Sequence, residues 1–347
     1  MKYRYLGNSG LKVSTICFGV MTFTGKEGWT HLGSIDQSEA NRLTDIALEK
    51  GVNFFDTADV YSNGVSEEML GSALKGKRAS AVIATKCGFK MNEGPNGDGH
   101  SRKRIIEACD ASLKRLQTDY IDLYQIHSYD FITPFEEFLS ALNELVKQGK
   151  VRYIGASNFF AWQLMKASAL SEKCGWEKFV SLQAYYSLLG RELEYEHVPV
   201  CVGEGLGIII WSPLHGGILT GKYNNSSVWP QGTRIKDETH VLPYDHEKCK
   251  LILNDVENIA RVHDTSMGNI SLGYILNKPG VTSVIIGARN ESQLRENISA
   301  GEILLSKEEM NTLDNSSAPS RIYPYWYFDT FRKERMENYF NNLYKRT

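Results

Sequence analysis

Four side chains of the kinds that move protons stand where strand-like apolar runs of the chain end. Asp56 closes the run Asn-Phe-Phe-Asp, and Tyr61 follows in the next turn. Lys86 closes the run Ala-Val-Ile-Ala-Thr-Lys, and His127 closes the run Leu-Tyr-Gln-Ile-His. In a barrel of parallel strands, residues at the C-terminal strand ends and in the loops after them form the active face. The positions of these residues therefore indicate one shared site.

Together these side chains can donate a proton to a carbonyl oxygen. A tyrosine, whose ordinary pKa is about 10, is a poor acid at neutral pH, but a neighbouring ammonium group favours the phenolate and lowers that pKa. Asp56 would keep Lys86 charged and oriented, and His127 would donate a hydrogen bond to the substrate carbonyl or help relay the proton. Each residue alone also fits an ordinary structural position, but four at successive strand ends favour catalysis. The component still missing is a hydride donor.

The elements that would position these residues alternate along the chain between strand-like apolar runs and amphipathic helical patterns. A hairpin is predicted first, around Asn8-Ser-Gly10. We predict strands near residues 16–20, 53–56, 81–86, 121–126, 151–156, 180–183, 207–211 and 283–286. We predict helices near residues 66–75, 102–116, 135–148, 160–171, 195–204 and 290–300, with a further helical stretch within 246–277.

Eight strand–helix units in 347 residues favour a closed (β/α)₈ TIM barrel over an open doubly wound sheet. We assign residues 1–318 to a single barrel domain. Residues 222–245 form a long polar loop after the seventh strand, and loops of that length are usually functional or disordered. Residues 319–347 form an aromatic and charged tail, which we expect to fold over the barrel mouth as part of the same domain or to serve an oligomer interface.

Composition excludes several other classes of protein. A net charge of −2 argues against nucleic acid and anionic membranes as partners. The N-terminus lacks the apolar run of a signal peptide, and stretches of about 18 apolar residues are absent. The six cysteines form no Cys-x-x-Cys and the eight histidines no His-x-x-x-His, so we expect reduced thiols and no metal site. These features predict a cytoplasmic protein, and they leave open whether it is a monomer or a homo-oligomer.

Six segments of the chain match the motifs of a known family. They are Leu6-Gly-Asn-Ser-Gly-Leu-Lys-Val-Ser14, Phe55-Asp-Thr-Ala-Asp-Val-Tyr61, Thr85-Lys86, Asp119-Tyr-Ile-Asp-Leu-Tyr-Gln-Ile-His127, Gly149-Lys-Val-Arg-Tyr-Ile-Gly-Ala-Ser-Asn158 and Val284-Ile-Ile-Gly-Ala-Arg-Asn-Glu-Ser-Gln293. Through them the chain resembles the aldo-keto reductase superfamily over nearly its whole length, in its bacterial-type and potassium-channel beta-subunit branch. The resemblance implies an NADP(H)-dependent carbonyl reductase with Tyr61 as proton donor, Lys86 and Asp56 tuning it, and His127 orienting the carbonyl.

The resemblance also carries over the residues that would hold the cofactor. At the nicotinamide they are Ser157, Asn158 and Gln183 for the carboxamide and Trp211 stacking on the ring; around the pyrophosphate they are Ser212, Leu214, Gly216 and Lys222, with Arg234 as a second phosphate contact. At the adenosine end they are Arg289, Gln293, Glu296 and Asn297, and Gly287 stands where the family's better-known members have a lysine. An arginine favours NADP over NAD because a planar cation can bind the 2′-phosphate bidentately.

The substrate end of the predicted site is apolar. Met21, Phe23, Trp29 and Phe89 would line it, which suits many aldehydes and ketones, sugar-derived ones included. Two alternatives to carbonyl reduction stay open. One is the reverse reaction, oxidation of a sugar or polyol alcohol. The other is a cofactor-binding regulatory subunit resembling the potassium-channel beta subunits.

Overall fold

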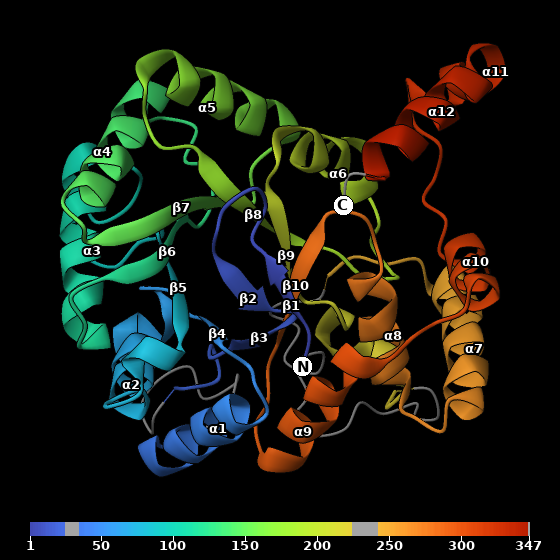
Figure 1. Ribbon diagram of the computed structural model, residues 1–347, viewed down its shortest axis with the longest axis horizontal. Coiled ribbons are helices and arrows are strands. Elements are labelled where there is room, and N and C mark those ends of the chain that lie inside the picture. Colours follow the sequence, from blue (N-terminus) through green and yellow to red (C-terminus); the bar gives the residue numbers. More distant parts are fainter. Residues whose placement is uncertain (25–34, 224–241, 346–347) are drawn as a thin grey trace.

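A closed barrel of eight parallel strands forms the centre of the protein (Figure 1). The structure is a computed structural model and describes residues 1–24, 35–223 and 242–345. The strands are β3 (Ile16–Gly19), β4 (Phe54–Asp56), β5 (Val82–Cys87), β6 (Ile121–Ile126), β7 (Val151–Ser157), β8 (Phe179–Tyr185), β9 (Gly207–Trp211) and β10 (Val281–Ile286). They follow one another in chain order, and β10 pairs with β3 to close the barrel. The predicted (β/α)₈ fold is confirmed.

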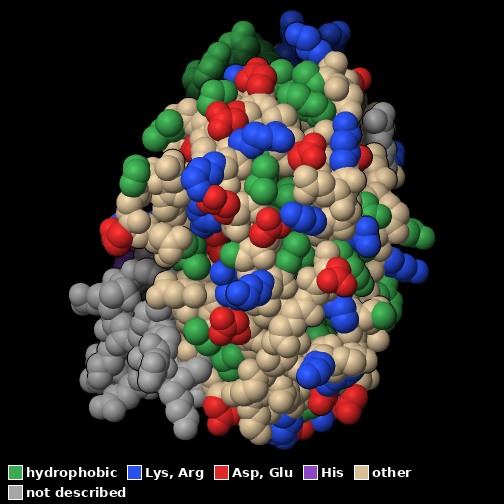
Figure 2. Space-filling model, turned by 90° about the vertical axis from the view of Figure 1, so that its left-hand side faces the viewer, with side chains coloured by type: hydrophobic (Ala, Val, Ile, Leu, Met, Phe, Trp, Pro, Cys, Tyr) green, Lys and Arg blue, Asp and Glu red, His purple; other side chains and the backbone are tan. Residues whose placement is uncertain are grey.

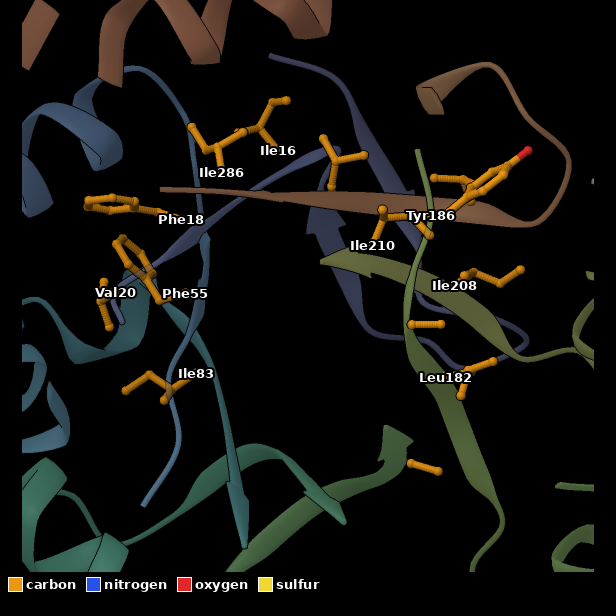
Figure 3. Packing of buried hydrophobic residues seen from close by; sticks show 14 of the residues in the cluster. Ile16, Phe18, Val20, Phe55, Ile83, Leu182, Tyr186, Ile208, Ile210 and Ile286 are labelled. Atoms are coloured by element: carbon orange, nitrogen blue, oxygen red, sulfur yellow. The ribbon is translucent and has the colours of Figure 1, made fainter. Parts of the chain in front are cut away.

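The strands are apolar on both faces because both faces are buried, as is usual for parallel sheets. Successive residues of a strand point to opposite faces, so one set faces the barrel interior and the other faces the helices. A small cluster that includes Cys17, Phe54 and Leu123 fills the interior. The larger cluster lies between barrel and helices, where Figure 3 shows Phe18 next to Phe55, with ring centroids 6.2 Å apart. The C-terminal strand ends, which carry the polar residues, are therefore held in place by packed apolar side chains on both faces of the sheet.

The predicted N-terminal hairpin closes one end of the barrel interior. Its strands β1 (Tyr3–Tyr5) and β2 (Lys12–Ser14) are antiparallel, and Leu6 and Val13 pack into the interior cluster. The turn comes very close to the loop before β9: a Cβ added to Gly7, which has φ +58°, would lie 2.3 Å from the carbonyl oxygen of Gly205. The barrel interior is thus accessible from the opposite side, at the C-terminal ends of the strands.

Helices surround the barrel (Figure 1). They are α1 (Gln37–Glu49), α2 (Val65–Ala73), α3 (Arg102–Leu116), α4 (Phe135–Lys147), α5 (Ala161–Cys174), α6 (Leu193–Glu204), α7 (His246–Val262), α8 (Met267–Leu276), α9 (Glu291–Ser299) and α10 (Lys307–Ser316). Neither α1 nor α10 was among the helices predicted from the sequence. The stretch predicted within 246–277 is two helices, because Asp264 takes a φ of 47° and the Ser266 side chain caps a new helix by accepting from the Asn269 amide.

The C-terminal tail forms two more helices, α11 (Tyr325–Phe331) and α12 (Lys333–Tyr344), which extend from the body beside α6 (Figure 1). The Tyr325 and Tyr195 rings lie 5.3 Å apart, and the Tyr325 hydroxyl donates to the Tyr195 carbonyl. Tyr323 and Phe331 keep more than half of their surface exposed. The tail therefore packs against α6, whereas we had expected it to close over the barrel mouth. The oligomer interface stays a prediction.

The surface mixes charges of both signs. On the face shown in Figure 2, Lys and Arg side chains are interspersed with Asp and Glu side chains rather than gathered by sign. Within residues 1–24, 35–223 and 242–345, helices long and apolar enough to cross a membrane are absent. All six cysteines are unpaired, and Cys174 is the exposed one.

Candidate active site

A cavity of about 890 Å³ lies at the C-terminal ends of the barrel strands. It brings together most of the residues that sequence analysis selected: Met21, Asp56, Tyr61, Phe89, His127, Ser157, Asn158, Gln183, Trp211, Ser212, Leu214, Gly216, Lys222, Gly287, Arg289, Gln293, Glu296 and Asn297. Lys86 lies directly behind Tyr61. Trp29 and Arg234 fall outside the described residues.

Phe23 is placed differently from the sequence-based expectation. It is fully buried in the core between barrel and helices, with its ring 5.7 Å from that of Phe18. An apolar side chain near a strand end can face either the cavity or the helices, and the sequence does not distinguish the two. The substrate end is instead walled by Met21, Val60 and Phe89.

The predicted proton-donating residues form one hydrogen-bonded group. Lys86 Nζ donates to Asp56 Oδ1 over 2.6 Å and to the Thr57 carbonyl over 2.7 Å. It also lies 3.3 Å from the Tyr61 hydroxyl. The Lys86 side chain is fully buried and that of Asp56 nearly so, at 0% and 4% exposed. A buried ammonium with these three oxygen partners has one fixed position, so the Tyr61 hydroxyl faces a permanent positive charge.

Burial and charge act in opposite directions on Lys86. Desolvation favours the neutral amine, but the Asp56 carboxylate and the Tyr61 hydroxyl favour the ammonium, and the pKa of Lys86 lies above its ordinary value. The group therefore stays protonated at neutral pH. This is the charge state that favours the phenolate form of Tyr61 once its proton has left.

His127 completes the group and is neutral. Burial, and then the nearby Lys86 charge, lower its pKa well below the ordinary value of 6.5. Its ring lies 5.7 Å from that of Tyr61 and 4.5 Å from that of Phe89. Its Nδ1 is buried without a hydrogen-bond partner among the described residues, which leaves Nε2 toward the cavity. A neutral imidazole in that position can donate a hydrogen bond without carrying charge.

The loop that carries Tyr61 is held by neighbouring elements. The amides of Thr57 and Asp59 donate to the carbonyls of Ala84 and Lys86, so the loop continues the pairing with β5. Asp59 accepts from the buried Arg104 over 2.8 Å. After Tyr61 the chain turns through three residues with positive φ, Ser62 (49°), Asn63 (54°) and Gly64 (94°). This unusual turn leads directly into α2.

Asn158 connects the histidine to the tryptophan. Its Nδ2 donates to the His127 carbonyl over 3.0 Å, and its Oδ1 accepts from the Trp211 indole over 3.1 Å. Asn158 has a φ of 55°, a conformation that asparagine tolerates better than most residues. Most of its hydrogen-bonding capacity is therefore used within the protein, and one of its effects is to hold Trp211 in place.

The cavity wall that follows β9 exposes backbone, which a ligand can approach closely. Ser212, Gly216 and Gly217 all have positive φ, at 51°, 65° and 95°. A Cβ added to Gly217 would lie 2.7 Å from Lys222 Nζ, whereas one added to Gly216 would meet nothing within 4 Å. Backbone amides beside a lysine ammonium form a setting that suits phosphate groups.

The start of α9 supplies the far end of the cavity. The Arg289 amide donates to Gln293 Oε1 over 2.9 Å, and Asn297 donates to the Gly287 carbonyl over 3.1 Å. Arg289 is exposed, and a side chain added at Gly287 would meet nothing within 4 Å. The segment thus offers a cation and open space rather than a closed pocket.

Gln125 is a site residue that sequence reasoning missed. It is fully buried, and its Nε2 lies 3.4 Å from Asp56 Oδ2. The two-residue period of β6 puts Gln125 on the same face as His127, and a polar residue inside an apolar run was the available signal. The same reasoning explains why Asp56, Lys86 and Gln183 all face inward.

The arrangement has two chemically distinct ends. Near β4, β5 and β6 a tyrosine hydroxyl and a neutral imidazole face the cavity, backed by a buried ammonium. Near β9 and β10 a flat indole, backbone amides and exposed cations line it. The second end fits a nicotinamide dinucleotide, because it combines an aromatic plane for the ring with cations beside side-chain-free glycines for the phosphates.

Comparisons with known proteins agree with this geometry. A family model described as the aldo/keto reductase family matches residues 15–318. "Versiconal hemiacetal acetate reductase" of Aspergillus parasiticus is 36% identical over 346 residues, covering 93% of this chain and 99% of the relative. "Uncharacterized oxidoreductase YrpG" of Bacillus subtilis is 40% identical, covering 91% and 95%. "Probable voltage-gated potassium channel subunit beta" of Arabidopsis thaliana is 35% identical, covering 88% and 92%.

Proposed function

The chain belongs to the aldo/keto reductase family and is an oxidoreductase, and from this premise we propose that it reduces an aldehyde or ketone to the alcohol with NADPH. Tyr61 donates the proton to the carbonyl oxygen. The observation that carries the proposal is the buried group in which Lys86 contacts both Asp56 and Tyr61, at 2.6 Å and 3.3 Å. A structural ion pair alone would not require a tyrosine hydroxyl at the mouth of a cavity.

Each residue of the group has a separate task. Lys86 stabilises the Tyr61 phenolate that forms when the proton leaves, and Asp56 keeps Lys86 charged. The neutral His127 donates a hydrogen bond to the substrate oxygen, which polarises the carbonyl before the proton is transferred. Met21, Val60 and Phe89 form the apolar wall around this end of the cavity.

The cofactor residues are those predicted from the resemblance. Gln183 and Trp211 would hold the nicotinamide, Ser212 and Lys222 the phosphates, and Arg289 the adenosine 2′-phosphate. When bound, the reduced nicotinamide supplies the hydride for the carbonyl carbon. The family uses nicotinamide cofactors, and the preference for the phosphorylated form is supported by the exposed Arg289 at the start of α9.

The test is a panel of aromatic aldehydes, aliphatic aldehydes, ketones and keto-sugars, followed by the loss of NADPH absorbance. We expect turnover with at least one class, and we expect the product to be the alcohol. If NADPH binds tightly while the whole panel, run in both directions, gives no turnover, the reductase proposal is wrong.

Two other functions share the site. Relatives named as putative aryl-alcohol dehydrogenases, such as one from Schizosaccharomyces pombe that is 36% identical, favour the oxidative direction. The same residues would then act in reverse, with the Tyr61 phenolate accepting the alcohol proton.

Relatives named as channel beta subunits favour a regulatory role. Cofactor binding without turnover on any carbonyl or alcohol would support that role.

A further inference from the structure

Asp56 has a second hydrogen-bonding partner besides Lys86. Its Oδ2 accepts from Gln183 Nε2 over 2.7 Å, while its Oδ1 accepts from Lys86 Nζ over 2.6 Å. Gln183 belongs to β8 and Lys86 to β5, so one carboxylate joins opposite sides of the barrel. Asp56 and Gln183 are each 3% exposed. The contact is therefore short and almost fully buried.

The chemistry of this contact gives the Gln183 amide one orientation. A carboxylate beside an ammonium accepts hydrogen bonds and cannot donate them, so Gln183 must direct its NH₂ group toward Asp56. Its Oε1 then points away from Asp56. Gln183 lines the cavity, and its Oε1 accepts no hydrogen bond from the described residues. The oxygen is thus presented to the cavity as an acceptor.

We propose that Asp56 is a positioning residue for cofactor binding, because it fixes the Gln183 amide so that Oε1 accepts from the carboxamide NH₂ of the nicotinamide. The inference rests on the proposed function, since it requires a nicotinamide in this cavity. It adds to Asp56 a role separate from its effect on Lys86. One carboxylate then sets both the charge behind the proton donor and the polarity of the nicotinamide site.

Replacing Asp56 with asparagine should reverse the polarity of this site. Asp56→Asn retains one oxygen and gains an NH₂ group, and the oxygen must face the Lys86 ammonium. The new NH₂ then faces Gln183, whose amide turns to present its oxygen. Gln183 Nε2 would consequently face the cavity, where it would meet the NH₂ of the carboxamide as donor against donor.

The experiment compares the dissociation constants of NADP⁺ and its 3-acetylpyridine analogue, measured by calorimetric titration. The analogue has a carbonyl group but lacks the NH₂ donor. We expect the parent to bind NADP⁺ about threefold to tenfold more tightly than the analogue, the range of one net hydrogen bond. This preference should fall to about one in Asp56→Asn and in Gln183→Leu. A ratio of two affinities is insensitive to general destabilisation, and Gln183→Leu serves if Asp56→Asn does not fold.

Gln125→Met is the matched control. Gln125 contacts the same Asp56 oxygen, at 3.4 Å, but does not line the cavity. Its variant should keep the parent's preference. The proposal is overturned if Asp56→Asn or Gln183→Leu keeps the parent's preference, if Gln125→Met loses it too, or if the parent binds both ligands equally. Failure of the parent to bind either ligand would instead reject the proposed function itself.

Discussion

The two ends of the cavity hold their polar groups in opposite ways. At the proton-donating end, Asp56, Lys86 and His127 are buried, and Lys86 and Asp56 are bonded to each other. At the phosphate end, Lys222 and Arg289 are exposed. The first end is assembled by the barrel itself, from three strand ends. The second is made of loop backbone and exposed cations.

The difference follows from the cost of burying charge. A buried ammonium and carboxylate must find partners within the protein, so their geometry is fixed before any ligand binds. Exposed cations are hydrated and screened, so they attract anionic groups at little cost to folding. We conclude that the proton-donating end is preorganised for chemistry and that the phosphate end is organised for binding.

The largest expected effect tests the chemical role of the first end. Tyr61→Phe removes one hydroxyl and keeps the ring, so kcat for carbonyl reduction should fall by about 10²–10⁴, the contribution of a general acid. NADPH affinity, measured by fluorescence titration, should stay within about twofold because the substitution keeps the ring and removes only the hydroxyl that acts on the substrate. A loss of activity below tenfold would show that another group donates the proton.

The next effect compares the same substitution at both ends. Lys86→Met leaves the Asp56 carboxylate buried without its cation, and breaking such a pair costs about 3–5 kcal/mol of unfolding free energy. Lys222→Met removes an exposed cation and should change stability by no more than about 0.5 kcal/mol. Urea denaturation of both variants measures the difference. Equal losses would contradict the distinction between the two ends.

A smaller effect concerns the phosphate end alone. Arg289→Ala should weaken NADPH binding about threefold to tenfold and NADH binding less than twofold, since an exposed ion pair contributes about 1 kcal/mol. The NADPH effect should shrink in high salt. Arg295→Ala, also on the α9 segment but not lining the cavity, is the control. Equal weakening of both cofactors would remove the assignment of Arg289 to the 2′-phosphate.

The smallest effect is the pH dependence contributed by His127. Its folded-state pKa is lowered by burial and by Lys86, whereas the unfolded chain has the ordinary value of 6.5. Below pH 6.5 the unfolded state therefore binds a proton that the folded state refuses, and stability falls as the pH decreases. His127→Gln should lose less stability than the parent between pH 7.5 and 5.5, as followed by urea denaturation. Identical pH profiles would mean that His127 is not neutral in the folded protein.

Much of the fold and of the proton-donating end of the site could be predicted from the sequence. Alternating strand and helix patterns indicated the barrel, and the ends of parallel strands meet on one face, so Asp56, Lys86 and His127 could be grouped from their positions. α1 was not predicted, although Leu43 and Ile46 lie on its buried face together with Thr44 and two alanines. Phe23 was misplaced because apolar side chains near strand ends suit either face.

The sequence alone determined which residues stand at the strand ends, because residue type and strand position are both local. The tertiary structure decided which polar atom each of them contacts. The bond between Asp56 and Gln183 joins residues 127 positions apart, and the contact of Trp211 with Asn158 joins the end of β9 to the loop after β7. Such contacts depend on how the closed barrel staggers its strands, and the stagger results from packing around the whole ring.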